Sequence, residues 1–296
     1  MIKTFFSSLR IIFYLFILVL VYVFYLSRDL PSLERLETFD PAMLSTLYDR
    51  NGEVIGEFYI QKRVFVDIED MPNHLKNAAI ASEDKRFYSH WGVDLQSFFR
   101  AVVVNVSSMS FRQGFSTLSQ QLARNLYKEV GFKDSITRKL KEMITAIQIE
   151  RTYTKDEILE MYLNTVHFGH GTYGAESAAK RFFNKNASDL TIGESAMLIG
   201  LLPSPANYSP LRNLNKAIGR RSIVLKLMYN QDFISYQEYM EHNSIVPDNI
   251  YYEIPKGKAP YFAEHVRRIL EQQDEQLGIN IYQDGLKIHT TLDYRL

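Results

Sequence analysis

The stretch DSITRKLKEMITAIQIERT, residues 134–152, indicates the fold class of the chain. Its apolar residues recur at the spacing of one helix face, which predicts an amphipathic helix with a stripe packed into a core. This stripe consists of Leu140, Met143, Ile144, Ala146 and Ile147. The same helical period continues through most of the chain from Met71 onward. The sequence therefore predicts a mainly α fold.

The predicted helices follow one another with short connections. They are expected at residues 74–88, 95–106, 117–128, 137–151, 155–166, 173–183, 191–202, 216–229 and 236–242. Three of them begin with a capping box, in which a hydroxyl side chain and an acid three residues later satisfy each other's backbone amides. The pairs are Thr154 with Glu157, Thr191 with Glu194 and Ser235 with Glu238. These acids are therefore assigned to structure rather than to chemistry.

Two segments have the pattern of strands. Residues 45–60, STLYDRNGEVIGEFYI, alternate around Asn51 and Gly52, which predicts a hairpin with a two-residue turn whose central residues both have positive φ. The segment GLKIHTTLDYRL, residues 285–296, reads as a further strand after a change of composition at Asp248. A small β element is thus expected beside the helices.

The overall composition excludes several classes of function. The 296 residues include 34 basic and 34 acidic side chains, so no net charge attracts the chain to nucleic acid. The absence of cysteine excludes disulfides, thiolate metal sites and a cysteine nucleophile. A hydrophobic content of 46% is sufficient for a large core. Any cationic site must therefore be local.

The N-terminus has the pattern of a membrane anchor. Residues 11–26 carry no charge, and apolar residues from Phe5 onward extend the run to the roughly 20 residues that span a bilayer. Lys3 and Arg10 precede it, so the positive-inside rule places the N-terminus in the cytoplasm and the remainder outside. The alternative, a cleaved signal peptide, lacks a small-x-small site. We expect an uncleaved single-pass anchor in residues 1–27.

A first candidate for chemistry is Glu83, in the stretch ASEDKRFYSHWG, residues 81–92. The preceding helix should deliver its carboxylate beside the aromatic residues Phe87, Tyr88 and Trp91. Partial burial there would raise the pKa of Glu83 and suit it to proton transfer. The alternative is a surface acid paired with a neighbouring cation, Lys85 or Arg86.

A second candidate is the group of cations at the start of the 134–152 helix. Arg138, Lys139 and Lys141 stand where the helix dipole disfavours positive charge by about 0.3 to 1 kcal/mol each. Glu142 follows Arg138 by four residues, which is the less favourable order for an ion pair, so intrahelical pairing explains the group poorly. We interpret it as a binding site for a phosphate-bearing ligand, with a solvated basic face as the alternative.

A third candidate is the helix predicted in RQGFSTLSQQLARNLY, residues 112–127. Ser116 or Thr117 can cap its N-terminus, and a helix N-terminus favours anionic ligands. Its polar side carries Gln120, Gln121, Arg124 and Asn125, opposite Leu118, Leu122 and Leu126. A diphosphate or sugar ligand suits this arrangement, although taken alone it is an ordinary amphipathic helix.

Read together, these stretches resemble the five signature blocks of the peptidoglycan glycosyltransferases, glycosyltransferase family 51, over about residues 47–229. The blocks correspond to EDKRFYSHWG at 83–92, QGFSTLSQQLARN at 113–125, RKLKE at 138–142, KDEILEMYLNTVHFGHGTYGAESAAKRFF at 155–183 and LTIGESAMLIGLLPSPANYSP at 190–210. This domain forms the N-terminal half of class A penicillin-binding proteins and also occurs as a monofunctional enzyme. The resemblance implies a lysozyme-like glycosyltransferase domain.

The resemblance also implies roles for individual residues. Glu83 is expected to be the general base and Glu142 a second acidic residue that supports the reacting groups. The residues expected to bind substrate are Asp84, Phe87, His90, Ser116, Thr117, Gln120, Gln121, Arg124, Asn125, Arg138 and Lys139. The chain departs from the family pattern at Arg124, usually a lysine, at Phe115, usually a small residue, and at Ser119, usually a threonine.

The implied reaction is the polymerisation of lipid II into β-1,4 glycan strands, with release of undecaprenyl diphosphate and inversion at the donor sugar. The implied partners are lipid II, the growing glycan strand, the outer face of the bacterial plasma membrane and a cell-wall synthesis complex, with no nucleic acid. Mg²⁺ or Mn²⁺ at the diphosphate is the only cofactor that the family suggests. The expected organisation is an anchor at 1–27, a linker at 28–46, the glycosyltransferase domain at 47–245 and, at 246–296, a linker towards an absent transpeptidase domain.

Several alternatives remain open. A lysozyme-like muramidase would need an acid for a sugar leaving group and no basic site. A penicillin-binding transpeptidase would need acylation chemistry, for which Ser177 and Lys180 give an S-x-x-K match with no later K-T-G. The others are a non-catalytic envelope scaffold and a truncated bifunctional penicillin-binding protein. His167 and His170 have the spacing of metal ligands, but the flanking glycines favour a structural turn. Apolar residues such as Val103, Met109 and Phe111 are candidates for insertion into lipid, although interior packing explains Val103 equally well.

Overall fold

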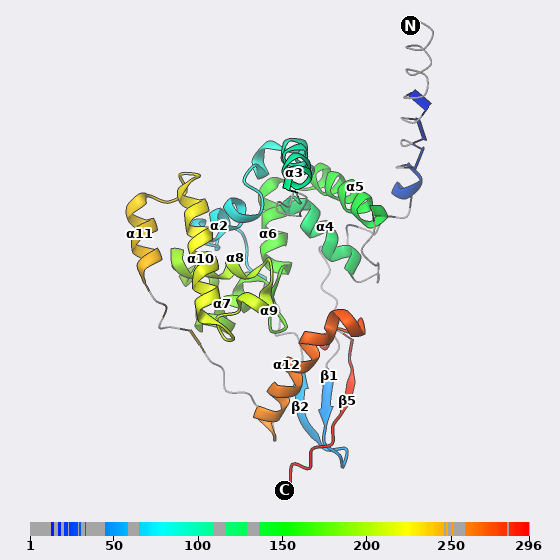
Figure 1. The fold of residues 1–296 in the computed structure, drawn as a ribbon, viewed down its shortest axis with the longest axis vertical. Helices are drawn as coiled ribbons and strands as arrows, with labels where there is room; N and C mark the ends of the chain where they lie inside the picture. The colour runs from blue at the N-terminus through cyan, green and yellow to red at the C-terminus, as the bar shows by residue number, and fades with distance from the viewer. Residues whose placement is uncertain are drawn as a thin grey trace, which may run out of the picture. The chain divides into compact units, whose positions relative to one another are not determined.

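The computed structural model describes residues 13–14, 17–18, 21–22, 24–28, 30, 33, 45–58, 65–108, 116–128, 136–245, 247, 250–251, 258–282 and 284–295. The chain divides into two compact units. One comprises residues 1–39 and 88–158, and the other comprises residues 40–87 and 159–296. Helices dominate the described part of both (Figure 1), which confirms the predicted mainly α fold.

The first unit is built from helices. They are α3 (Leu95–Ser108), α4 (Leu118–Lys128), α5 (Ile136–Thr152) and the start of α6 (Lys155–Thr165). Helix α4 packs along α5 (Figure 1). Leu118 and Leu122 of α4 are fully buried, as are Ala146 and Ile149 of α5. Both helices therefore bury apolar side chains where the first unit has its core.

The predicted core stripe of α5 is wrong in detail. Leu140, Met143, Ile144 and Ile147 are only half-buried, whereas the buried face carries Glu142, Thr145, Ala146 and Ile149. A helix buries a polar face only where its polar groups find partners, because an unpaired buried charge is costly. The partners of Glu142 are described below.

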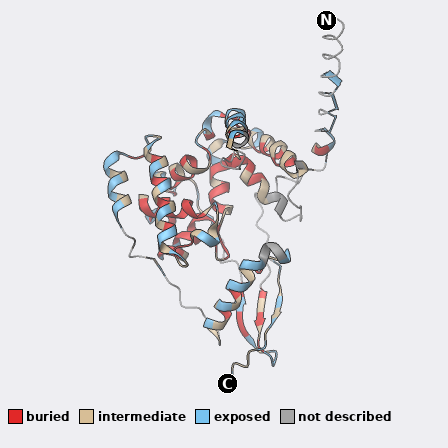
Figure 2. Cartoon of the chain, viewed as in Figure 1, coloured by how far each residue is buried: buried red, intermediate tan, exposed pale blue. Residues whose placement is uncertain are grey.

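The second unit holds the remaining helices. They are α2 (Asn73–Glu83), α7 (Ala175–Phe183), α8 (Ile192–Leu201), α9 (Pro205–Tyr208), α10 (Leu214–Tyr229), α11 (Tyr236–Ser244) and α12 (Pro260–Leu277). Helix α8 packs against α2 and α10 and is buried along its length, whereas α11 has no buried residue (Figure 2). A Cβ atom at Gly200 would lie 3.2 Å from Arg220 Cβ, so glycine permits the close approach of α8 to α10.

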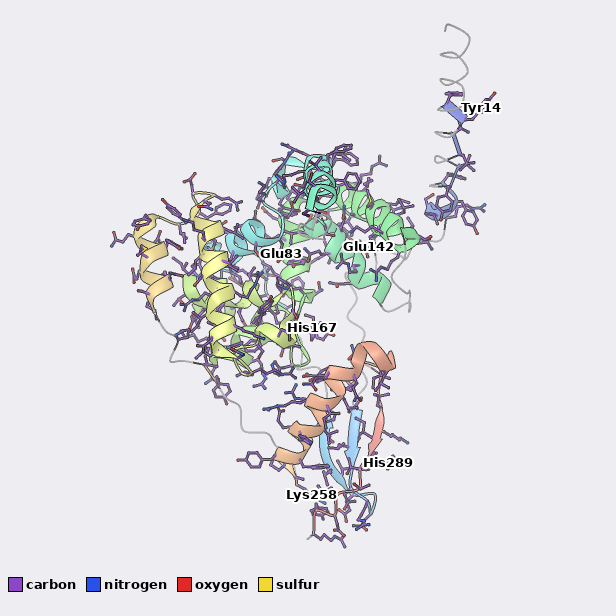
Figure 3. All side chains as sticks on the ribbon, viewed as in Figure 1. Tyr14, Glu83, Glu142, His167, Lys258 and His289 are labelled. Carbon is purple, nitrogen blue, oxygen red and sulfur yellow. The ribbon has the colours of Figure 1, made fainter. Side chains whose placement is uncertain are left out.

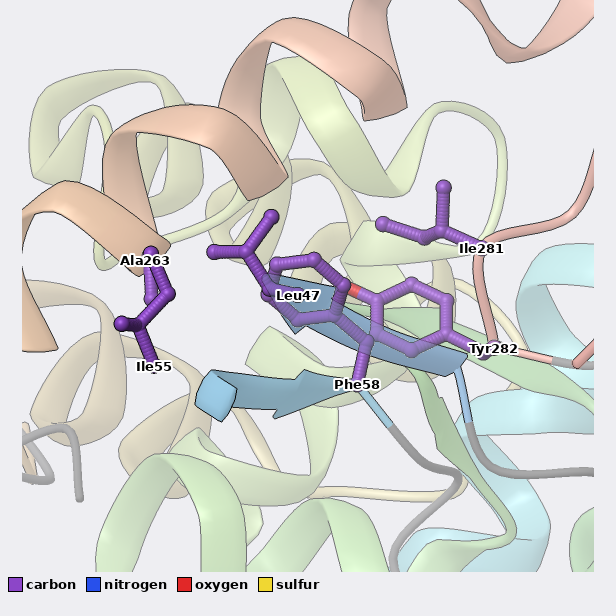
Figure 4. Close-up of a cluster of buried hydrophobic side chains, with 6 residues drawn as sticks. All are labelled: Leu47, Ile55, Phe58, Ala263, Ile281 and Tyr282. Carbon is purple, nitrogen blue, oxygen red and sulfur yellow. The ribbon is translucent and has the colours of Figure 1, made fainter. Parts of the chain in front are cut away.

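A three-stranded sheet in the second unit joins distant parts of the chain. Strand β1 (Ser45–Tyr48) pairs antiparallel with β2 (Val54–Phe58) and parallel with β5 (Lys287–His289), in the order β2-β1-β5. Helix α12 packs across this sheet (Figure 1). The shared core consists of Leu47, Ile55, Phe58, Ala263, Ile281 and Tyr282 (Figure 4). The strand predicted near the C-terminus is confirmed, while α12 was not predicted.

The predicted hairpin is confirmed but its turn differs. Gly52 has a φ of 81°, whereas Asn51 has no positive φ. The Asp49 carboxylate accepts hydrogen bonds at 2.8 Å from the amides of Asn51 and Glu53, so the turn extends from Asp49 to Glu53. Because this side chain satisfies the turn amides, only Gly52 needs the left-handed conformation.

Several helix ends differ from the sequence predictions. The first predicted helix stops at Glu83 rather than continuing to Tyr88, because the chain leaves the helical region at Asp84 and forms a 3₁₀ turn at Phe87–Ser89. Helix α7 begins at Ala175, since β3 (His167–Gly169) and β4 (Thr172–Tyr173) form a second hairpin before it. His170, with a φ of 54°, lies in that turn, which confirms the structural interpretation of the His167–His170 segment.

All three predicted capping boxes are present. The hydroxyl of Thr154, Thr191 or Ser235 accepts from the amide of the acid three residues on, at 3.2 to 3.3 Å, and that acid accepts from the amide of the capping residue.

Much of the predicted anchor lies outside the described residues. The described positions between 13 and 27 are helical, and several expose large apolar side chains, among them Tyr14 (Figure 3). In the part of the chain that the structure describes, none of the helices has both the length and the apolar character needed to cross a bilayer.

Candidate active site

The centre of the candidate site in the first unit is Glu142 of α5 (Figure 3). Its side chain is fully buried. Its Oε1 lies 3.3 Å from Arg124 Nε and 3.3 Å from Arg138 Nε, and its Oε2 lies 3.0 Å from Lys139 Nζ. The side chains of these cations are 35%, 22% and 27% exposed. We call Glu142 with Arg124, Arg138 and Lys139 the cation cluster.

This geometry bears on the two interpretations of the basic residues, a binding site for a phosphate-bearing ligand and a solvated basic face. The cations turn inward to a shared carboxylate, so they do not form a solvated basic face. Arg138 and Lys139 do pair within their own helix, contrary to the argument from pair orientation. Three cationic side chains thus share one buried carboxylate. Since each cation also reaches solvent, the cluster can attract an anion.

Two residues outside the cluster bond to it: Ser116, which precedes α4, and Gln120 in the first turn of α4. Lys139 Nζ donates to Ser116 Oγ at 2.9 Å and to Gln120 Oε1 at 3.0 Å, and Arg124 donates to Ser116 Oγ at 3.3 Å. Burial lowers the pKa of Lys139, and the nearby Glu142 opposes that shift. Four predicted substrate-binding residues, Ser116, Gln120, Arg124 and Lys139, therefore form one bonded group.

Thr117 is the N-cap of α4. The sequence predicted either Ser116 or Thr117 in this position. Thr117 Oγ1 accepts from the Gln120 amide at 3.1 Å and donates to the Gly92 carbonyl at 2.7 Å. Gln120 Nε2 donates to the same carbonyl at 3.4 Å. A Cβ atom at Gly92, where φ is 102°, would lie 2.7 Å from the Ala146 carbonyl oxygen. The end of the first block is therefore packed tightly onto α4 and α5.

His90 is buried and bonded within its own block. Its Nδ1 accepts from the Gly92 amide at 3.1 Å and lies 3.7 Å from Glu150 Oε1. Gln121 and Asn125 are partly exposed on α4. Lys141, the third cation of the predicted group, is buried rather than part of the cluster around Glu142.

Glu83, Asp84 and Phe87 belong to the second unit. Glu83 is the last residue of α2 (Figure 3), is half-buried, and has its Oε1 3.4 Å from Ser82 Oγ. Asp84 is buried at the end of the helix, and its carbonyl accepts from the Phe87 amide at 2.9 Å. Phe87 is completely enclosed, a position typical of core packing, whereas Tyr88 and Trp91 are mostly exposed.

Sequence reasoning missed a second buried carboxylate in the first unit. Glu150 accepts from Ser119 Oγ at 2.5 Å and from Lys155 Nζ at 2.7 Å. The available signal was Lys155 itself, which stands at the first position of α6, where the helix dipole disfavours a cation.

The described residues do not fit the divalent cation that the family suggests. Both oxygens of Glu142 already face cations, and a metal ion there would have to displace them. Within the described ranges, no group of three or more His, Asp and Glu side chains is placed to hold a metal ion. We therefore assign no step to a metal.

The chain is similar to a known protein family and to several known proteins. The transglycosylase family model matches residues 51–229. Penicillin-binding protein 1A of Neisseria gonorrhoeae is 42% identical over 267 residues, which cover 89% of this chain and 32% of that protein. Penicillin-binding protein 1A of Aquifex aeolicus is 36% identical over 285 residues, which cover 96% and 38%. The chain thus spans about a third of the length of these curated relatives.

A crystal structure of penicillin-binding protein 1A from Haemophilus influenzae is also similar. It aligns with 87% of this chain and 28% of its own, with 24% sequence identity and a TM-score of 0.44.

Proposed function

We propose, because this chain belongs to the transglycosylase family, that it is a peptidoglycan glycosyltransferase. It would polymerise lipid II into β-1,4 glycan strands and release undecaprenyl diphosphate. The catalytic part would be a lysozyme-like domain within residues 47–245.

The observation that carries the proposal is the cation cluster. A glycosyl diphosphate leaves as an anion, so its departure needs positive charge rather than a proton. Arg124, Arg138 and Lys139 supply that charge on a fixed frame, because Glu142 holds all three from the buried side. Glu142 would thus act through the cations, which fits its complete burial. The arginine at position 124 keeps the charge of the usual lysine and adds a planar fork that can bind two oxygens.

The proposed reaction is a single displacement. Glu83 takes the proton from the attacking sugar hydroxyl of the acceptor, the hydroxyl oxygen forms a bond to the anomeric carbon of the donor, and the bond to the diphosphate breaks. Since the donor is α-linked and the product is β-linked, one inversion suffices. The half-buried position of Glu83 at the end of α2 supports its role as the base, because the carboxylate is held by a helix and still reaches solvent.

A lipid-linked substrate would place the site at the outer face of the plasma membrane. The uncharged N-terminal run supports a single-pass anchor with a cytoplasmic N-terminus. Helix α3 supports contact with lipid, since Leu95, Phe99 and Val103 form one stripe at four-residue spacing and are 50%, 63% and 63% exposed. This exposure contradicts interior packing of Val103. Met109 and Phe111 lie outside the described residues. A cell-wall synthesis complex would be the further partner.

Purified lipid II provides the test. The full chain should convert it to polymer, whereas Glu83→Gln should give none and Glu142→Gln should be strongly impaired. Glu57→Gln, on strand β2, serves as a control for loss of an exposed carboxylate and should polymerise normally. Failure of the full chain to form polymer would reject the proposal.

The competing activities predict other outcomes. A muramidase would release sugars from preformed glycan and would have no use for the cation cluster. A transpeptidase would be labelled by a fluorescent penicillin. The S-x-x-K match does not support that reaction, because Ser177 is buried inside α7 and Lys180 pairs with Glu176 at 3.1 Å.

A further inference from the structure

The first turn of α6 carries a cation that the site described above does not use. Lys155 Nζ lies 2.7 Å from the Glu150 carboxylate and donates to the His90 carbonyl at 2.8 Å. The Glu150 side chain is only 6% exposed and that of Lys155 is 21% exposed, so water hardly competes for the pair. A lysine at the start of a helix opposes the helix dipole, and these two partners explain its position.

Glu150 connects three helices. It lies on α5, binds Lys155 of α6 and accepts from Ser119 Oγ of α4 at 2.5 Å. Ser119 directly precedes Gln120, whose Oε1 receives a hydrogen bond from Lys139 of the cation cluster. A single buried carboxylate therefore fixes the start of α6 and the first turn of α4 relative to α5.

The loop of residues 88–92 is held at three points by this frame. Lys155 donates to the His90 carbonyl, and the Tyr88 hydroxyl donates to Asp156 at 3.2 Å. The first turn of α6 therefore fixes one side of the loop. Thr117 and Gln120 bind the Gly92 carbonyl on the other side. Gln120 thereby belongs to both the loop and the cation cluster, which makes a continuous path of contacts from Lys155 to Lys139.

We propose that Glu150 and Lys155 are positioning residues for glycosyl transfer, and this inference rests on the proposed function. They would hold the loop that follows Glu83 and Asp84 in the sequence and, through Gln120, the direction of Lys139. Neither residue would touch the reacting atoms. Their effect is on geometry, to which transfer rates are steeply sensitive.

Polymerisation of lipid II by the full chain tests the role. Lys155→Met and Glu150→Gln should each lower kcat by about 10- to 100-fold, with KM within threefold, because the ligand-binding cations remain. The double variant should be no slower than the slower single variant, since the two residues act as one unit. Lys155→Arg should recover part of the rate.

A matched control separates positioning from the stability of the helix. Glu157→Ala removes the capping box at the same turn of α6. The Glu157 side chain accepts hydrogen bonds from Thr154 rather than from the loop. The kcat of Glu157→Ala should stay within threefold of the original. Equal losses in Glu157→Ala and Lys155→Met, or independent losses that multiply in the double variant, would overturn the positioning role.

Amide hydrogen exchange gives a readout that does not depend on activity. Lys155→Met should speed exchange across residues 88–92 at least tenfold, while the amides in the middle of α8 stay unchanged. Unchanged exchange in the loop would overturn the inference even if kcat fell. An inactive original chain would reject the proposed function itself, whereas an active chain with unaffected variants would reject only the positioning role.

Discussion

Arg124 on α4 and Glu142 on α5 meet across the helix pair, with 3.3 Å between Nε and Oε1. Arg138 and Lys139 reach the same carboxylate from within α5. Glu142 therefore neutralises part of a positive cluster that would otherwise repel itself, and it fixes where each cation stands.

Replacement of the buried carboxylate should cost both stability and activity. Glu142→Gln leaves three cations facing an uncharged amide. We expect the free energy of unfolding to fall by about 1 to 3 kcal/mol, below the usual range for a broken buried pair because the cations are partly hydrated. The rate of polymerisation should fall roughly 100-fold. Urea unfolding and lipid II turnover measure the two effects.

Glu53→Gln is the matched control. Glu53 also contacts two cations, Lys258 and Arg295, each at 2.6 Å, but both cations are well exposed. Exposed pairs contribute little to stability, because water and salt screen them. Losses of equal size in Glu53→Gln and Glu142→Gln would contradict the importance of burial.

Lys139 should set an alkaline limit on activity. Burial lowers its pKa, so the cluster loses one positive charge at a pH below the ordinary range for lysine. Lys139→Arg should keep its charge and extend the alkaline limb of kcat/KM to higher pH. The pH profiles of the two proteins between pH 7 and 10.5 provide the comparison, and coincident limbs would argue against a titrating Lys139.

The lowered pKa of Lys139 also makes the free energy of unfolding depend on pH. Between the lowered pKa of folded Lys139 and its ordinary value of 10.5, the unfolded chain binds more protons. The contribution of Lys139 is therefore fully present above 10.5 and is lost as pH falls through the lowered value. Lys139→Met should remove this rise of the unfolding free energy with pH.

The starts of several helices could be predicted from the sequence because capping residues lie within a few positions of one another. The capping boxes at Thr154, Thr191 and Ser235 each mark a helix start within one residue. Helix α12 was missed although Ala263, Val266 and Leu270 repeat at helical spacing, because the change of composition favoured a linker. These residues pack on the three-stranded sheet, which forms only when β5 returns to β1 from far along the chain.

The site was predictable in composition but not in arrangement. The unfavourable position of Arg138 and Lys139 on the helix dipole drew attention to two of the three cations that contact Glu142. An apolar stripe, however, suggested that Leu140 and Ile144 face the core, whereas α5 buries Glu142 instead. Burial of a charge depends on partners from another helix, here Arg124, and periodicity within a single segment contains no information about them.

Gly92 should tolerate no side chain. Gly92→Ala would place Cβ 2.7 Å from the Ala146 carbonyl oxygen at a φ of 102°. Gly52→Ala is the matched control, because Gly52 also has a positive φ, 81°, but has nothing within 4 Å. We expect about 1 kcal/mol of destabilisation from backbone strain at Gly52 and a further 1 to 3 kcal/mol at Gly92. Similar unfolding midpoints for the two variants would contradict the close packing of the loop.

The exposed apolar stripe on α3 should contribute to binding of the protein to a lipid bilayer. Phe99→Glu replaces an exposed apolar side chain whose burial in lipid is worth about 1.5 to 3 kcal/mol, so the apparent KM for lipid II in vesicles should rise at least tenfold. Gln96→Glu adds the same charge one position after Leu95 and off the stripe, and should change KM little. Equal effects of the two variants would indicate charge repulsion rather than loss of apolar contact.

His170 should make the second unit sensitive to acid. Burial, together with Arg267, Arg181 and Arg212, lowers its pKa from 6.5 to about 2, and its Nε2 lies 2.7 Å from Ser209 Oγ. The unfolded chain thus binds a proton that the folded chain refuses between about pH 6.5 and 2. The stabilising contribution of His170 is present above 6.5 and is lost as pH falls through that window. From pH 7 to pH 5 the loss should be about 1 to 2 kcal/mol, and His170→Asn should abolish it. Urea unfolding of both proteins at the two pH values measures the difference, and an undiminished acid loss in His170→Asn would show that another group is responsible.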